Sequence, residues 1–445
     1  MEFLSQTLKS AIIVLFGIGS ANAEDLMAVY QLAAKNDANI QAAEFSYQAS
    51  SEDIIQARAA LIPELYFDAS HSETDQEITD SQNPVFHSGS ASYSTQTYGL
   101  TISVPIFRYE AWKRYAQSKA TVKQAKAEFL AAEQQLMLNT AESYFGVLAA
   151  KDNLEFARAE RAAIERQLEL AQARNKKGLT TITNLRDAQA RYAASEAQVV
   201  VVGDTLEDAY RELQEYTSVL VVDFSVLQEE IPLAPPQPAI VTDWISTSLK
   251  QSYDLEALRH AIAAAMEEVK RQQAGHLPTV DLVGTLNNRD ADGSLFGGGS
   301  EVRTGEVVLN FNLPLYSGGS TSSQAREANF RYQQVMREYE AQRRSLDRET
   351  RNAFRGVLSG IKEVESLKKT VLFQRSALDV KEQGLKSGLN TTIEVLDAQR
   401  DLHRAKRGYS QARYNYLLSI LRLKRSAGTL APDDLKMLNT LLTSS

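Results

Sequence analysis

Cysteine is absent from this chain of 445 residues, and histidine occurs only five times. Without cysteine there is no disulfide, no thiolate metal ligand and no cysteine nucleophile. No two histidines lie within one helical turn of each other, which argues against a histidine-rich metal site. The histidines are His71, His87, His260, His276 and His403. We therefore expect neither a metal nor another cofactor.

Basic residues are in the minority as well. Lys and Arg total 48 against 56 Asp and Glu, which gives a formal net charge of -8. Binding to nucleic acid requires a basic face for the phosphates, so we expect no nucleic-acid partner. The sequence also has no HExxH, no phosphate-binding loop and no nucleophile elbow. These absences argue against an enzyme.

Long apolar runs are missing except near the N-terminus. Residues 1–23 combine Lys9, an apolar run over residues 11–18 and the end Ala21-Asn22-Ala23, a pattern typical of a signal peptide. We expect cleavage after Ala23 and an exported chain, with an uncleaved anchor as the alternative. No later run approaches the roughly 18 residues of a transmembrane helix. A membrane crossing would therefore require a closed β-barrel, because lipid leaves no backbone polar group unpaired.

The sequence repeats itself at an interval of 210 residues. The run Gly178-Leu179-Thr180-Thr181, followed by Asp187-Ala188-Gln189, returns as Gly388-Leu389-Asn390-Thr391, followed by Asp397-Ala398-Gln399. Other landmarks keep the same order, which indicates an internal tandem duplication. We predict a first structural repeat over 24–230, a proline-rich connector over 231–241, a second repeat over 242–428 and a C-terminal equatorial or tail segment over 429–445.

Each half predicts a helix, two strands and a very long helix. The first helices are expected over 41–61 and 255–274, and the long ones over 109–175 and 320–386, where no proline interrupts. Apolar residues alternate with small or polar ones over 98–104 and 307–313, which is typical of short strands with one apolar face. That face can meet lipid or the core of a soluble sheet. The polar segments 72–92 and 287–301 are expected to be exposed loops.

The helix after each glycine turn carries a heptad pattern, with apolar or small residues spaced alternately by three and four. In the first half these are Leu185, Ala188, Tyr192, Ser195, Val199, Val202, Leu206, Ala209, Leu213 and Tyr216. In the second half they are Val395, Ala398, Leu402, Ala405, Tyr409, Ala412, Tyr416, Ser419, Leu423 and Ser426. These helices are therefore expected to pack as coiled coils.

Four strands per chain cannot close a barrel, and open edges are not tolerated in lipid. Three chains would supply twelve strands, enough to surround an aqueous lumen. The predicted fold class is an α+β membrane protein. It is a homotrimeric twelve-stranded β-barrel, with four strands per chain, continuous with a long α-helical coiled-coil barrel.

The second-half runs Val395-Leu396-Asp397-Ala398-Gln399 and Ala412-Arg413-Tyr414-Asn415-Tyr416-Leu417 are similar to those of the TolC family of outer membrane efflux and secretion channels. The resemblance covers nearly the whole mature chain. It implies a homotrimer in the outer membrane with a large periplasmic portion, and a collar around 219–243 and the C-terminal end. The implied partners are outer membrane lipid, a periplasmic adaptor, and an inner membrane pump or ABC transporter. An exported coiled-coil scaffold without channel activity is the alternative.

The resemblance also implies a constriction at the periplasmic tip, lined by Glu394 and Asp397. Three residues apart on a helix, they share a face and would form two stacked acidic rings in a trimer. The rings would favour cations and make the pore sensitive to multivalent cations. The alternative for Glu394 is a carboxylate in the first turn of a helix that only complements the helix dipole.

One departure from the family concerns how the tip is held shut. The positions of an Arg and an Asp that link neighbouring helix pairs in relatives are occupied by Asn390 and Asn184. Thr183 of the same network is kept, and Leu385 stands where a Tyr is expected. We predict a closed state that is less strongly latched, or latched elsewhere, with an Asn–Asn hydrogen bond as a weaker substitute.

The two glycine turns are the predicted contact surface for the adaptor. Gly178, Leu179 and Thr180 in one turn, and Gly388 and Leu389 in the other, expose a leucine on a tight turn. The alternative is ordinary helix capping by glycine with a nearby apolar contact. Both interpretations are compatible.

Overall fold

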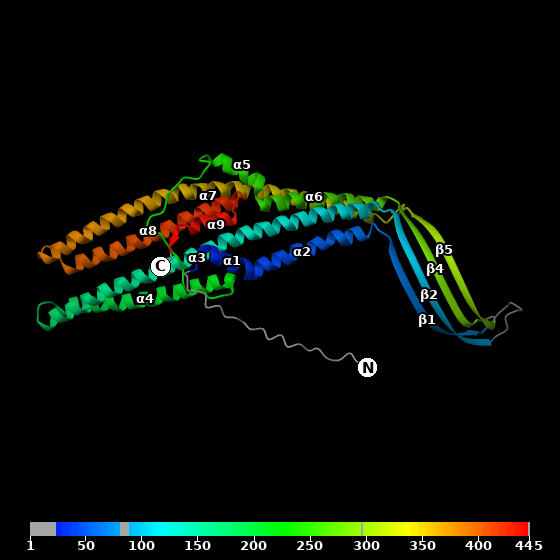
Figure 1. Cartoon of the computed structure of the whole chain (residues 1–445), viewed down its shortest axis with the longest axis horizontal. Helices are drawn as coiled ribbons and strands as arrows, with labels where there is room; N and C mark the ends of the chain where they lie inside the picture. The colour runs from blue at the N-terminus through cyan, green and yellow to red at the C-terminus, as the bar shows by residue number, and fades with distance from the viewer. Residues whose placement is uncertain (1–23, 81–88, 295–296, 444–445) are drawn as a thin grey trace, which may run out of the picture.

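The protein is described here by a computed structural model, which covers residues 24–80, 89–294 and 297–443. The predicted signal peptide, residues 1–23, lies outside the described residues. The molecule is elongated: a bent sheet occupies one end, and helices run from it toward two separate hairpin tips at the other (Figure 1). Within the described ranges, no helix combines the length and apolarity needed to cross a bilayer.

The same order of elements occurs twice along the chain. The first half contains α1 (Leu26–Asn36), α2 (Ala38–Ala59), β1 (Glu64–Ile78), β2 (Gly89–Phe107), α3 (Tyr109–Lys176) and α4 (Ile182–Thr217). The second half contains α5 (Val241–Gln251), α6 (Tyr253–Gln273), β4 (Thr279–Ser294), β5 (Gly297–Asn312), α7 (Ser320–Lys386) and α8 (Thr392–Ser426). Short elements lie outside this pattern: β3 (Val226–Leu227), the 3-10 turn η1 (Ala274–His276), α9 (Pro432–Asn439) and β6 (Leu442–Thr443). The repeat boundaries stay a prediction, and α5 begins at the last residue assigned to the connector.

The long helices were predicted correctly, whereas two short helices were not anticipated. α3 and α7 have 68 and 67 residues, with bounds within one residue of those expected from the sequence. α1 and α5 precede the expected helices α2 and α6. Asp25 and Asp37 are the N-cap residues of α1 and α2. Each side chain accepts a hydrogen bond from the backbone amide three residues on, at 2.8 and 2.7 Å.

The four long strands form one antiparallel sheet in the order β1-β2-β4-β5. Its register places apolar side chains opposite one another, for example Phe67 opposite Leu100 and Leu282 opposite Leu309. Residues that share this face near the helices include Leu65, Phe67, Leu100, Ile102, Leu286, Val307, Leu309 and Phe311, all exposed. The opposite face carries pairs such as Thr101 with Thr285. The sheet therefore has one apolar and one polar face.

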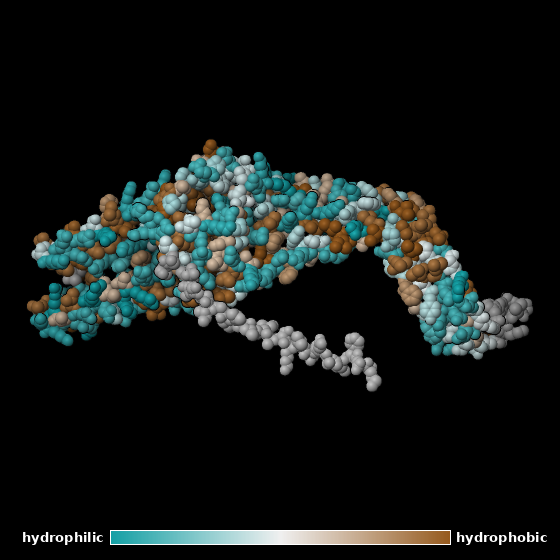
Figure 2. Space-filling view, viewed as in Figure 1, coloured by the Kyte–Doolittle hydropathy of each residue, from teal (hydrophilic) through white to brown (hydrophobic). Residues whose placement is uncertain are grey.

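The prediction of loops over 72–92 and 287–301 was wrong for 72–78, 89–92, 287–294 and 297–301, which are strands, while 81–88 and 295–296 lie outside the described residues. β1 continues to Ile78, β2 starts at Gly89, and β4 and β5 extend through Ser294 and from Gly297. These outer parts are polar on both faces, and Figure 2 shows the sheet changing from brown near the helices to teal toward its far end. The strands are held there by backbone pairing, so the hydrophobic alternation used to predict strands does not report them.

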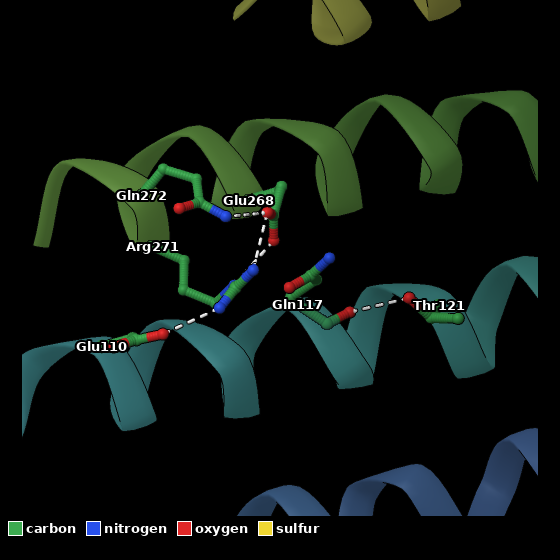
Figure 3. A network of polar contacts seen from close by, with 6 residues as sticks. All are labelled: Glu110, Gln117, Thr121, Glu268, Arg271 and Gln272. Atoms are coloured by element: carbon green, nitrogen blue, oxygen red, sulfur yellow. Dashed lines mark hydrogen bonds and ion pairs between the residues drawn. The ribbon is translucent and has the colours of Figure 1, made fainter. Parts of the chain in front are cut away.

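A cluster of polar side chains links the two halves where the helices approach the sheet. Arg271 of α6 contacts Glu110 of α3 at 2.8 Å and also binds Glu268 on its own helix at 2.7 Å (Figure 3). Next to it, Lys113 contacts Glu267 at 3.2 Å. Because these pairs join α3 to α6, they hold the junction between the sheet and the helices.

The largest core lies midway along the helices, which we call the equator. There Tyr144 packs against Phe145 and Phe224, with ring centroids 5.7 and 5.3 Å apart, and Phe145 stacks on Tyr414 at 5.6 Å. The hydroxyl of Tyr144 donates to the carbonyl of Ser225 at 2.8 Å. The length of helix beyond the equator has few buried large side chains, so the equator is the main packed centre of the chain.

Both ends of the described chain attach to residues 223–228, a segment that we call the clasp. The amide of Glu24 donates to Asp223 at 2.9 Å. On the other side, the amide of Gln228 donates to Leu441 at 3.0 Å, and β3 pairs with β6. The clasp therefore joins residues near 24 and near 441 through one short stretch in the middle of the sequence.

The heptad prediction for α4 and α8 is confirmed by burial. All twenty seam positions are buried or half-buried; most of the other residues are exposed on α4, whereas on α8 most of them are buried or half-buried as well. α4 packs along α3, and α8 packs along α7 and also along α3. The chain thus presents two helical hairpins, α3–α4 and α7–α8, with α3 next to α8.

Candidate functional site at the hairpin tips

The two hairpins end in turns with the same backbone. Gly178 and Gly388 both adopt left-handed conformations, with φ of +69° and +77°. The next residue folds back: the amide of Leu179 donates to Arg174 and the amide of Leu389 donates to Gly384, at 2.9 and 2.8 Å. This geometry caps the C-terminal end of each long helix, and only glycine adopts it without steric strain.

The helix that leaves each turn starts with a threonine cap. The side chains of Thr181 and Thr391 each accept a hydrogen bond from the amide three residues on, both at 3.3 Å. Only α8 completes a capping box, because the carboxylate of Glu394 accepts from the Thr391 amide at 2.7 Å. In the first hairpin Asn184 stands at the equivalent position.

Glu394 is therefore fixed within its own turn. Besides the Thr391 amide, its carboxylate accepts a hydrogen bond from the side chain of Asn390 at 3.1 Å. The hydrogen bond from the Thr391 backbone, helped by those from Asn390 and the Thr391 side chain, holds the pKa of Glu394 below its ordinary value. Glu394 lies in the first turn of α8, as the helix-dipole alternative assumed, and it also completes a capping box that was not expected. Its place in a ring of three copies stays a prediction.

Asp397 lies one turn further and faces the other hairpin. Its carboxylate is 3.7 Å from the guanidinium of Arg191 on α4 and 3.4 Å from that of Arg400 on α8. The side chain remains 39 % exposed, so solvent reaches it between these contacts. Sequence reasoning placed Asp397 at the tip but missed Arg191, because the pairing depends on how the hairpins lie side by side.

The four residues of the predicted gate network do not form a network within one chain. The side-chain amide of Asn184 donates to Thr180 at 3.1 Å, while that of Asn390 donates to Glu394. The suggested Asn184–Asn390 hydrogen bond is therefore not made between these residues of one chain. Thr183 is exposed, and Leu385 is half-buried on α7. A latch built by neighbouring copies remains a prediction.

Gly384 is a tip residue that sequence analysis missed. A Cβ at this position would lie only 2.0 Å from the side-chain oxygen of Asn390. The Gly384 carbonyl also accepts from the amides of Leu389 and Asn390, at 2.8 and 3.2 Å. The missing side chain thus gives Asn390 room beside the last turn of α7. The signal was present in the sequence as a glycine four residues before Gly388.

The outermost residues of both turns are apolar and exposed. Leu179 is 72 % exposed and Leu389 is 84 % exposed, and Ile182 and Ile393 follow at the start of the next helix. Brown residues are visible among the teal at both tips in Figure 2. Such side chains gain free energy when a partner covers them. A cleft of about 270 Å³ also separates the tips, lined in part by Arg174, Asn184, Thr391 and Ile393.

Metal ligands do not cluster at the tips. Over residues 24–80, 89–294 and 297–443, no three His, Asp or Glu side chains gather as a metal site would require. The tips therefore combine exposed leucines, capped helix starts and a few charged side chains, an arrangement suited to contacts with other molecules.

Comparison with known proteins finds a match over nearly the whole chain. The profile of the family described as outer membrane efflux protein matches residues 29–218 and 244–429. The chain is 30% identical over 419 residues to the outer membrane protein TolC of Vibrio cholerae, covering 94% of this chain and 93% of that protein. It is 29% identical to the proteases secretion protein PrtF of Dickeya chrysanthemi, over 94% and 91% of the two chains.

Solved structures share the same fold. The Campylobacter jejuni CmeC outer membrane channel superimposes with a TM-score of 0.80 at 18% sequence identity, covering 95% of this chain and 90% of that one. The Vibrio cholerae outer membrane protein VceC gives a TM-score of 0.75 at 20% identity, over 91% and 96%. At these identities the likeness concerns the arrangement of helices and sheet.

Proposed function

The chain belongs to the outer membrane efflux protein family, and from this premise we propose that it forms the exit duct of efflux pumps or type I secretion systems. Three copies would join their four-stranded sheets into a twelve-stranded barrel in the outer membrane. Their helical hairpins would continue as a periplasmic tunnel. The repeat boundaries 24–230 and 242–428 would give this assembly approximate sixfold symmetry.

The observation that carries the proposal is the four-stranded sheet. Its helix-proximal half is apolar and exposed on one face and polar on the other. Its edge strands β1 and β5 have no further partner among the described residues. Apolar exposure and unpaired edges are both unfavourable in water, and both are relieved when copies close a barrel within lipid. Nothing in the described part of the chain favours the coiled-coil scaffold over this duct.

The exposed leucines at the hairpin tips suggest where a partner protein binds. We propose that a periplasmic adaptor docks on Leu179 and Leu389, with an inner membrane pump or ABC transporter completing the pathway. Proteins named for protease secretion and for efflux occur among the relatives, so both kinds of cargo remain within the proposal. Glu394 and Asp397 from three copies would form the acidic constriction.

The test is single-channel conductance of the purified protein in a planar bilayer, titrated with a trivalent cation. We expect stable, cation-selective steps that the cation blocks. Glu394→Gln with Asp397→Asn removes the charges, and glutamine preserves the capping box, so the fold of the turn is kept. The half-blocking concentration should rise about tenfold or more, the equivalent of ~1.4 kcal/mol.

Glu327→Gln is the matched control, since this exposed glutamate pairs with Arg331 on the upper part of α7. It should leave the block unchanged. If the double variant shows conductance steps that the cation blocks as before, the constriction must lie elsewhere in the duct. No conductance from a verified trimer would contradict the duct itself.

A further inference from the structure

An open groove runs between the two hairpins above the tips. α3 forms its floor with Ala157, Glu160 and Ile164, while α4 and α8 form its walls. Its volume is about 380 Å³. Four of the side chains that line it are arginines: Arg191 on α4, and Arg400, Arg404 and Arg407 on α8.

The arginines gather because of their spacing along α8. Positions 400, 404 and 407 are separated by four and three residues, so they lie on one face of a helix. Opposite them, Ala194 and Ser195 on α4 are small and leave room in the groove. The positive charge comes from the α8 wall, while α4 as a whole is acidic. α8 carries eight Lys or Arg and three Asp or Glu, whereas α4 carries three and seven.

Three carboxylates lie in or beside the groove against its four arginines: Glu160 on the floor, Asp397 and Asp401. Asp397 contacts Arg191 and Arg400, and Asp401 lies 3.5 Å from Arg400. Among the described residues, neither Arg404 nor Arg407 is within ion-pair distance of a carboxylate. The Nε of Arg407 is buried and has no hydrogen-bond partner in this part of the chain. Two guanidinium groups therefore line the groove without a carboxylate in ion-pair contact, although Glu160 lies on the same floor.

The neighbouring His403 is consistent with a positive environment. Burial lowers the pKa of this imidazole, and the charges of Lys406 and Arg407 lower it further, against the opposing effect of Glu160. His403 lies with Asp397 and Arg400 in a smaller pocket that adjoins the groove and shares Glu160, Arg191 and Arg400 with it.

We propose that this groove binds a small multivalent anion carrying phosphate or carboxylate groups, which bridges Arg191 of α4 to Arg404 and Arg407 of α8. Guanidinium groups bind such oxygens through paired hydrogen bonds, and a planar fork matches two oxygens at once. The volume suits a compact ligand rather than a folded partner. Because α4 and α8 belong to different hairpins, the bound anion would hold the two hairpins together. This inference concerns a site above the acidic constriction and does not depend on conduction.

The test is isothermal titration of the detergent-purified full chain with inorganic tripolyphosphate at low salt. We expect saturable binding that Arg404→Gln with Arg407→Gln weakens about tenfold or more, since each lost bidentate contact removes a charge-assisted pair. Arg404→Lys keeps the charge but not the fork, and should fall in between. Arg211→Gln is the control, because Arg211 is exposed on α4, pairs with Glu207 and lies outside the groove.

The bridging role has its own readout. Hydrogen exchange should slow on addition of tripolyphosphate both near residue 191 of α4 and near residue 404 of α8. Protection confined to α8 would overturn the bridge. Absence of saturable binding, or equal binding by the double variant, would overturn the site. Loss of the oligomer in that variant with unchanged tripolyphosphate binding would instead assign the arginines to contacts between copies.

Discussion

The turn between α3 and α4 and the turn between α7 and α8 share their backbone but differ in their polar side chains. Gly178 and Gly388 adopt the same conformation, and Thr181 and Thr391 make the same cap. Only the second turn adds a carboxylate, Glu394, that bonds back to the cap. The shared part is what the chain requires to reverse direction. The polar difference is where the two halves of the duplicated chain have become distinct.

The largest expected effect on local stability comes from replacing the glycine that the two turns share. Gly178→Ala and Gly388→Ala should each cost about 1–2 kcal/mol of local stability, because a Cβ is unfavourable at positive φ. The two costs should be equal, since no atom lies within 4 Å of either added Cβ. Hydrogen exchange at the last turns of α3 and α7 would measure the local opening free energy.

Gly203→Ala provides the control for that measurement. Gly203 lies inside α4 with open space around it, so alanine should stabilise the helix by about 1 kcal/mol. A large difference between the two turn variants would show that the turns are held differently despite their matching φ angles.

A smaller effect separates the two caps. Thr391→Ala should cost about 1 kcal/mol and Thr181→Ala about 0.5 kcal/mol, because only Thr391 also positions a carboxylate that satisfies a second backbone amide. The measurement is hydrogen exchange in the first turns of α8 and α4. Asn184→Glu should sharpen the comparison by installing the missing capping box and raising protection in α4. Equal losses in the two threonine variants would mean that the box adds nothing.

The smallest expected effect depends on pH. Since hydrogen bonds lower the pKa of Glu394 in the folded turn, its stabilising effect is complete above the ordinary pKa of 4.5. That effect is lost as the pH falls through the lowered folded value. Exchange in the first turn of α8, corrected for the intrinsic rate, should therefore accelerate in acid, while the first turn of α4 should not. Glu394→Gln should abolish the difference.

The parts that sequence analysis predicted well are those governed by local pattern. The stretches without proline predicted the length of α3 and α7, and the three-four spacing predicted the seams of α4 and α8. The family resemblance implied a collar around 219–243 and the C-terminal end, but the contacts that build the equator were not predicted, because they join residues that are distant in sequence. Tyr416, for example, both accepts from and donates to the backbone of Ala234, at 2.9 and 3.1 Å.

The candidate site divides in the same way. The glycine turns and the carboxylates at the tip could be named from the sequence, because their spacing is local. The contact of Asp397 with Arg191 could not, since it requires α3 to bring α4 and α8 together. The arginine face of α8 was also readable in principle from its spacing. Its significance appears only when Arg191 is seen on the opposite wall.

The clasp has a consequence for the order in which the molecule is completed. It pairs with Glu24 on one side and with Leu441 on the other, so its contacts span nearly all of the described chain. Contacts between residues far apart in sequence form slowly, because a long loop must first be closed. A chain synthesised from its N-terminus can form the α3–α4 hairpin and the Glu24 side of the clasp early, but the Leu441 side must wait for the residues after α9. The equator is therefore completed last. A chain truncated before residue 441 would keep its helical hairpins but leave the equator incomplete.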